Sequence, residues 1–220
     1  MKTTAIIVAA GSGSRFNSDK PKQFLEIGGK PVIVHTLERF QASPSVDQIV
    51  LVLAGDQIER FDRHCVPKIN SIVSGGATRA QSVLNGLNAV DTETSIIAVH
   101  DGARPLVTVE EIERTIERAK HTGAACLVAA VTDTIKTVVG GQISGTLDRA
   151  KLRRAFTPQV FSADLLRRAF DDTDLGESVT DECFLVERLG HPIAIVEGSS
   201  RNIKITYPED LAFAEALLMK

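Results

Sequence analysis

The chain of 220 residues has little cysteine, little net charge and no long apolar run. Its three cysteines, Cys65, Cys126 and Cys183, are widely spaced, which excludes a CxxC metal motif and a disulfide framework and suits a reducing cytoplasm. The formal net charge of −3 gives no broad basic surface, so we expect no nucleic-acid partner. No apolar run approaches membrane-spanning length, and the run from Ala5 to Ala10 is too short for a signal peptide.

That short apolar run leads into a glycine loop. Residues 6–8 are Ile-Ile-Val, and β-branched residues bounded by glycine predict a buried strand. Gly11 and Gly13 follow, and glycine lets a ligand lie close to the main chain, where backbone amides point at phosphate oxygens. Arg15 and Lys22 add positive charge. The stretch predicts a polyphosphate site, although a tight strand-to-helix turn explains the two glycines equally well.

Two common phosphate-binding motifs are excluded. A dinucleotide fingerprint needs a third glycine at the position of Phe16. A Walker A loop needs Ser or Thr after Gly29-Lys30, where this chain has Pro31. The failed fingerprint disfavours a dehydrogenase.

The next 120 residues alternate between strand and helix patterns. Apolar runs predict strands at residues 48–54, 69–73, 95–99 and 124–131, with helical spacing at 31–40, 79–90 and 109–119 between them. Strands alternating with helices predict βαβ units and a parallel sheet. We therefore expect one α/β domain over residues 1–220, a Rossmann-like, open, mostly parallel sheet flanked by helices, with an inserted β-hairpin.

Two further stretches lie at the carboxyl edge of this predicted sheet, where open α/β folds bind ligands. Gly75-Gly76 precedes a helix whose start carries Arg79, and a helix N-terminus attracts anions. Asp101 follows the strand at 95–99 and is a hard oxygen ligand suited to Mg²⁺. Taken alone, the stretch before Arg79 is more typical of a surface turn, and Asp101 is more typical of a cap or turn residue. Two glycine loops on the same edge favour the metal role for Asp101. We interpret His100 as structural.

The α/β pattern is interrupted by a predicted hairpin. Residues 134–139 and 142–147 alternate around Gly140-Gly141, which is typical of a β-hairpin. An isolated hairpin is marginally stable in water, so we expect it to lean on a second subunit. We call residues 132–156 the arm. It also carries a basic cluster, whose members are Arg149, Lys151, Arg153 and Arg154.

After the arm, the pattern predicts a helix at 163–170, another starting at 180–182, and strands at 192–196 and 203–205. Thr206 and Glu209 fit a capping box for a last helix. Lys204 lies between two isoleucines of the last predicted strand, so it should point away from them, as an exposed edge lysine does.

Taken together, these stretches resemble the cytidylyltransferases that make 4-diphosphocytidyl-2-C-methyl-D-erythritol in the non-mevalonate isoprenoid route. The matching motifs occur in family order along nearly the whole chain, at residues 9–15, 21–23, 75–79, 100–105, 133–136, 148–149, 157–159, 180–182 and 202–206. One departure is Gly102-Ala103, where the family often has Ala-Ala after the aspartate; we expect the glycine to loosen that loop.

The resemblance implies a role for each matching residue. Arg15, Lys22 and Lys204 would be the catalytic cations, and Asp101 the Mg²⁺ ligand. The CTP-binding positions would be Ala9, Ala10, Gly11, Gly13, Gly76, Arg79, Ser82 and Ala103. The polyol-phosphate contacts would be Thr134, Arg149 and Thr180, with the arm crossing to the other subunit of a homodimer.

The implied reaction joins CTP and 2-C-methyl-D-erythritol 4-phosphate and releases pyrophosphate, in the cytoplasm, without a membrane partner. Nucleophile and electrophile are both anions, so catalysis means neutralising and aligning them. Two alternatives stay open: a cytidylyltransferase acting on ribitol 5-phosphate, and a nucleotide-sensing module without turnover.

Overall fold

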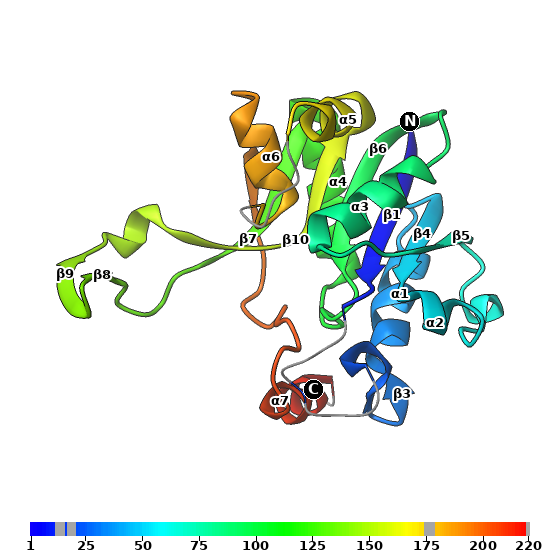
Figure 1. Cartoon of the computed structure of the whole chain (residues 1–220), viewed down its shortest axis with the longest axis horizontal. Helices are drawn as coiled ribbons and strands as arrows, with labels where there is room; N and C mark the ends of the chain where they lie inside the picture. The colour runs from blue at the N-terminus through cyan, green and yellow to red at the C-terminus, as the bar shows by residue number, and fades with distance from the viewer. Residues whose placement is uncertain (12–15, 17–20, 174–178, 219–220) are drawn as a thin grey trace.

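The computed structural model describes residues 1–11, 16, 21–173 and 179–218 (Figure 1). In these ranges, one seven-stranded sheet has the order β11-β7-β10-β6-β1-β4-β5. Neighbouring strands are parallel except where β10 pairs with β6 and β7. The strands of this sheet are β1 (Lys2–Ala9), β4 (Gln48–Leu53), β5 (Ile69–Ser74), β6 (Thr94–Asp101), β7 (Ala124–Ala130), β10 (Arg153–Ser162) and β11 (Ala194–Glu197). The predicted mostly parallel α/β sheet is confirmed.

Helices cover both faces of the sheet (Figure 1). Side chains of α1 and α4 pack on one face, and those of α3, α5 and α6 pack on the other. The α-helices are α1 (Val32–Ala42), α2 (Gly55–Ile58), α3 (Arg79–Asn88), α4 (Val109–Thr122), α5 (Ala163–Asp171), α6 (Glu182–Arg188) and α7 (Glu209–Leu218). None of the helices in the described ranges has both the length and the apolar character needed to cross a bilayer.

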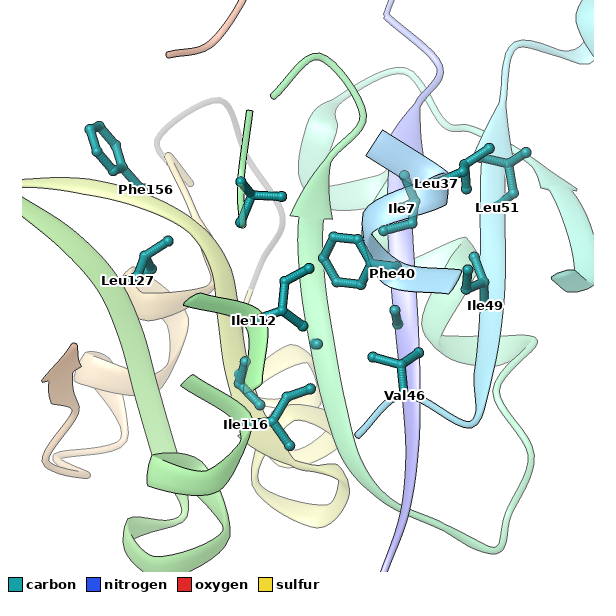
Figure 2. Packing of buried hydrophobic residues seen from close by; sticks show 14 of the residues in the cluster. Ile7, Leu37, Phe40, Val46, Ile49, Leu51, Ile112, Ile116, Leu127 and Phe156 are labelled. Carbon is teal, nitrogen blue, oxygen red and sulfur yellow. The ribbon is translucent and has the colours of Figure 1, made fainter. Parts of the chain in front are cut away.

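The core between the sheet and the α1–α4 layer is built from fully buried apolar side chains. In Figure 2, Phe40 of α1 lies between Ile112 of α4 on one side and Ile7 and Ile49 on the other, and the latter two come from two neighbouring strands. Burying apolar side chains contributes about 1.5–3 kcal/mol each, so this layer holds the carboxyl ends of the strands in place.

A smaller unit lies beyond the carboxyl edge of the sheet, where β1 points in Figure 1. The two-stranded ribbon β2 (Glu26–Ile27) and β3 (Lys30–Pro31) packs against α7 there. Ile27 and Ile205 are fully or almost fully buried in this contact. The end of the chain is thereby held next to the strand ends.

The predicted hairpin is present in the arm. Strands β8 (Lys136–Val139) and β9 (Gln142–Thr146) pair antiparallel, and Gly140 and Gly141 both have positive φ, as a tight hairpin turn requires. The hairpin projects away from the sheet (Figure 1).

Two local predictions are wrong, and one strand was not predicted. Residues 203–205 form no strand, although Ile203 and Ile205 both pack inward. The expected capping box of Thr206 and Glu209 is replaced by Asp210, whose carboxylate accepts from the backbone N–H groups of residues 206 and 207. The sequence pattern also missed β10, because its first residues are basic and Pro158 interrupts it.

Candidate active site

A cavity of about 600 Å³ opens at the carboxyl edge of the sheet. It lies where β1 and β6 end side by side and where the N-terminus of α3 and the loop before α7 approach them. Its lining residues are Val8, Ala9, Ala10, Gly11, Lys22, Gln23, Gly76, Ala77, Thr78, Arg79, Ser82, Asp101, Ala103, Lys204 and Thr206. The predicted sites at both glycine loops and at Asp101 therefore share one cavity.

The end of β1 and the short helix η2 (Lys22–Phe24) form one wall of the cavity. Gln23 is 2% exposed, and its amide donates to the carbonyl oxygens of Ala9 at 2.7 Å and Gly11 at 3.2 Å. Lys22 Nζ donates to the carbonyl oxygen of Ile205 at 2.7 Å. Gln23 thus anchors η2 to the strand end and keeps the ammonium group of Lys22 at the cavity.

The N-terminus of α3 forms the opposite wall. Thr78 caps this helix by accepting from the backbone N–H of Gln81, as a threonine N-cap does. Ser82 Oγ accepts from the backbone N–H of Gly76 at 3.1 Å and donates to the carbonyl of Thr78 at 2.9 Å. A side chain at Gly75 would collide with the Cβ of Ala10, so the two loops touch because this residue is glycine.

Asp101 is the centre of a cluster of charged side chains. Arg79 Nε lies 3.0 Å from Asp101 Oδ1, while Lys204 Nζ lies 2.9 Å and Arg104 Nε 3.4 Å from Oδ2. Three cations from three separate segments therefore meet at one carboxylate whose side chain is 9% exposed.

This surplus of positive charge determines the protonation of Asp101. Burial disfavours the charged carboxylate, but the combined attraction of Arg79, Lys204 and Arg104 outweighs burial and holds the pKa of Asp101 well below its usual range. At the neighbouring His100, burial outweighs the attraction of Asp101 and the hydrogen bond to the carbonyl of Arg104, and it lowers the pKa to about 3. His100 is therefore a neutral core residue bonded to the carbonyl of Arg104, in agreement with the structural role predicted for it.

The loop before α7 places Lys204 by backbone contacts. The amide of Asn202, a fully buried residue, donates to the carbonyl oxygen of Thr157 at 3.0 Å. The backbone N–H of Ile205 donates to the carbonyl of Ala103 at 2.8 Å. Lys204 is held between these two anchors, which is why it faces Asp101 and is not the edge lysine that the alternating pattern indicated.

A smaller hollow of about 150 Å³ adjoins the cavity. The two share Arg79, Asp101 and Lys204 as lining residues. Thr180, a predicted acceptor contact, lines this smaller hollow together with Arg104. The charge cluster is thus a common wall between the two spaces.

The remaining predicted site residues lie elsewhere. Thr134 and Arg149 are exposed on the arm and are absent from the described residues that line the two hollows. Arg149 Nη1 donates to the carbonyl of Thr132 at 2.6 Å. Gly13 and Arg15 lie outside the described residues.

Sequence reasoning missed three residues that build the cluster. Arg104 belongs to the motif at residues 100–105, in which the sequence predicts a functional role for Asp101 and Ala103 and none for Arg104. Glu182 was treated as part of a helix start, yet it is fully buried and forms a two-pronged ion pair with Arg79. Gln159 is 1% exposed, and its amide oxygen accepts from the backbone N–H groups of residues 182 and 183. The only sequence signal for Gln159 and Glu182 was their place in the motifs at residues 157–159 and 180–182.

The expectation of a loose loop at Gly102 is wrong. The backbone N–H of Gly102 donates to the carbonyl of Val8 at 2.8 Å. A Cβ at this position would lie 2.7 Å from Ile33 Cδ1 and 2.9 Å from Ala9 Cβ. The glycine therefore permits close packing between the Asp101 loop and the neighbouring strand.

The donor set limits what metal the cavity accepts. Asp101 is the only acidic side chain among the described residues that line it, and no group of three or more His, Cys, Asp or Glu gathers in the described ranges. A cation that needs an all-protein cage does not fit here. One carboxylate beside room for phosphate oxygens and water fits Mg²⁺, which is commonly held by one or two carboxylates and substrate phosphates.

Comparison with known proteins gives this cavity a family. The family described as 2-C-methyl-D-erythritol 4-phosphate cytidylyltransferase matches residues 3–220. The chain belongs to this family. Members of the cytidylyltransferase family are CTP-dependent nucleotidyltransferases, and the family predicted from the ordered motifs is confirmed.

Individual relatives agree over the whole chain. A bifunctional IspD/IspF enzyme of Desulfotalea psychrophila is 44% identical over 99% of this chain, which spans 57% of that enzyme. The 2-C-methyl-D-erythritol 4-phosphate cytidylyltransferase of Syntrophus aciditrophicus is 43% identical over 100% of this chain and 97% of the relative. The crystal structure of 4-diphosphocytidyl-2C-methyl-D-erythritol synthase from Anaerococcus prevotii superimposes with a TM-score of 0.85 at 30% identity, covering 100% of this chain and 96% of that one.

The charge cluster predicts how acid affects folding. The folded-state pKa of Asp101 lies below its unfolded value, so this carboxylate contributes stability above about pH 4, and the contribution is lost as pH falls. We expect the free energy of unfolding of the wild-type chain to fall more steeply between about pH 5 and about pH 3 than that of Asp101→Asn. Urea denaturation followed by circular dichroism measures both curves, and parallel slopes would contradict the ion pairing described above.

Proposed function

We propose that this chain transfers the cytidylyl group of CTP to the phosphate of 2-C-methyl-D-erythritol 4-phosphate and releases pyrophosphate, as its family does. The observation that carries the proposal is the meeting of Arg79, Arg104 and Lys204 at Asp101, between two adjoining hollows. A transfer between two phosphates needs cations at the reacting groups, because these groups repel each other until cations neutralise them, and this cluster supplies such cations.

The two hollows suit the two substrates. The larger one, between β1 and α3, combines backbone groups of the glycine loops with the Ser82 hydroxyl, which suits a nucleoside triphosphate. The smaller one, lined by Thr180 and Arg104, suits the acceptor phosphate. In this arrangement an oxygen of the acceptor phosphate attacks the α-phosphorus of CTP, a new P–O bond forms there, and the bond to pyrophosphate breaks.

The cations then have distinct tasks. Lys204 lies on the wall between the two hollows, where it stabilises the negative charge that develops on the α-phosphate. Lys22 lines the larger, nucleotide hollow and not the smaller one, and there it stabilises the phosphates of CTP. Resemblance to the family adds Arg15 to this set. No side chain has to act as a general base, because a phosphate monoester is already an anion near neutral pH, and the neutral, buried His100 is not needed for catalysis.

Asp101 would hold Mg²⁺ together with the phosphates of CTP. When bound there, the ion would neutralise phosphate charge and stabilise the leaving pyrophosphate. The low pKa of Asp101 supports this role, because the carboxylate is ionised at any physiological pH.

The direct test is pyrophosphate release from CTP with each candidate acceptor. We expect release with 2-C-methyl-D-erythritol 4-phosphate and Mg²⁺, and little with ribitol 5-phosphate, because the matching family and the full-length relatives are named for the former acceptor. A higher kcat/KM for ribitol 5-phosphate would replace the proposed acceptor. CTP binding without any release would instead favour a nucleotide-sensing module.

Lys22→Ala tests the cation on the nucleotide side. We expect kcat to fall by roughly 10²–10³ with the fold intact, by analogy with the loss of one donor from an oxyanion hole. Lys30→Ala is the matched control, because Lys30 forms an exposed ion pair with Glu38 outside the cavity. Unchanged turnover of Lys22→Ala in the same assay would remove Lys22 from the mechanism.

We propose further that the chain is a homodimer through the arm. Four apolar side chains of the arm are between 42% and 72% exposed, namely Val138, Val139, Ile143 and Leu147. A second copy would cover them and bring its Thr134 and Arg149 to the acceptor side, as the resemblance implies.

The three cysteines are free thiols, which supports a reducing cytoplasm as the location.

Sedimentation tests the dimer. We expect a species of twice 23.7 kDa at micromolar concentration, and a monomer with reduced turnover for Ile143→Asp, because a charge in an apolar contact carries a desolvation cost. A wild-type monomer with full activity would contradict the arm's role.

A further inference from the structure

Glu182 lies behind the charge cluster and lines neither hollow. Its side chain is 0% exposed, and its two carboxylate oxygens accept from Arg79 Nη1 at 2.7 Å and Nη2 at 3.0 Å. The remaining guanidinium nitrogen, Arg79 Nε, donates to Asp101 Oδ1 at 3.0 Å. Paired N–H groups on paired oxygens fix the plane of a guanidinium as well as its position. Glu182 therefore determines how Arg79 is presented at the wall between the two hollows.

Glu182 is itself held rigidly. Its backbone N–H donates to Gln159 Oε1 at 3.1 Å, and Gln159 Nε2 donates to Asp181 Oδ2 at 2.9 Å. Asp181 caps α6 by accepting from the backbone N–H of Phe184 at 2.9 Å. The first turn of α6 is thus fastened to β10, and the Glu182 carboxylate has little freedom to follow Arg79 if the arginine moves.

The same turn also reaches the acceptor side. Thr180, two residues before Glu182, lines the smaller hollow, while Arg79 lines both. One short segment, residues 180–182, therefore contacts the space assigned to the acceptor and fixes the arginine that faces the nucleotide.

We propose that Glu182 is a positioning residue for the transfer reaction, holding Arg79 in the plane that aligns the acceptor phosphate with the α-phosphate of CTP. This inference rests on the proposed function. It separates two effects of Glu182 that act in opposite directions. Its negative charge weakens the attraction of the site for CTP, whereas its hold on Arg79 serves the alignment on which turnover depends.

Glu182→Gln separates these effects, because glutamine keeps the size and removes the charge. We expect kcat to fall by roughly 10–100-fold, in line with the cost of small misplacements at a reacting centre. We expect the Kd for CTP, measured by calorimetry without acceptor, to stay within about threefold of wild type or to tighten. A merely structural role predicts a weaker Kd together with the loss of kcat.

Two further variants keep the test decisive. Glu182→Asp retains the charge but withdraws the carboxylate by one methylene, so we expect a partial loss of kcat; activity equal to wild type would show that only charge matters and overturn the proposal. In an Arg79→Gln background, Glu182→Gln should cause no further loss, because it acts through Arg79. Equal losses in both backgrounds would also overturn it.

Controls separate this inference from folding and from the proposed function. Asp91→Asn removes a carboxylate from an ion pair with Lys2 at the opposite end of the sheet, and should leave kcat unchanged. Thermal unfolding by circular dichroism tests whether each variant is folded at the assay temperature. If Glu182→Gln is not folded there, the kinetic test uses Glu182→Asp instead. A wild-type chain without pyrophosphate release refutes the proposed function; an active wild type with a fully active Glu182→Gln refutes only the role of Glu182.

Discussion

The attraction between one carboxylate and three cations is the constraint on which this site depends. Asp101 ends β6, and Arg79, Arg104 and Lys204 come from the start of α3, the loop after β6 and the loop before α7. Like charges at this spacing repel unless an anion lies between them. In the absence of substrate that anion is Asp101, and phosphate groups can take its place when they bind.

The fold supplies the rigidity that this arrangement requires. Parallel strands bring the ends of β1 and β6 to one edge, and the apolar layers on both faces fix those ends. The antiparallel strand β10 adds the anchors that the parallel strands lack. Thr157 Oγ1 accepts from the backbone N–H of Asp101, the carbonyl of Thr157 accepts from Asn202, and Gln159 holds the first turn of α6.

Periodicity predicted the sheet, the helices and the hairpin, because these depend on local patterns of apolar residues and glycine. It failed at β10 and at residues 203–205, where tertiary contacts outweigh local preference. Ordered motifs placed Asp101, Lys22 and Lys204 in one cavity correctly. They could not show that Glu182 turns inward, because glutamate in the first turn of a helix commonly faces solvent and stabilises the helix dipole.

Calorimetry of metal-free CTP binding to the wild type and to Asp101→Asn tests the central claim most directly. If the Asp101 carboxylate pairs with the three cations until phosphates replace it, Asp101→Asn leaves those cations unpaired. Metal-free CTP should then bind about tenfold more tightly to the variant than to the wild type. Adding Mg²⁺ should then strengthen binding to the wild type and not to the variant. Equal or weaker metal-free binding by the variant would contradict the account.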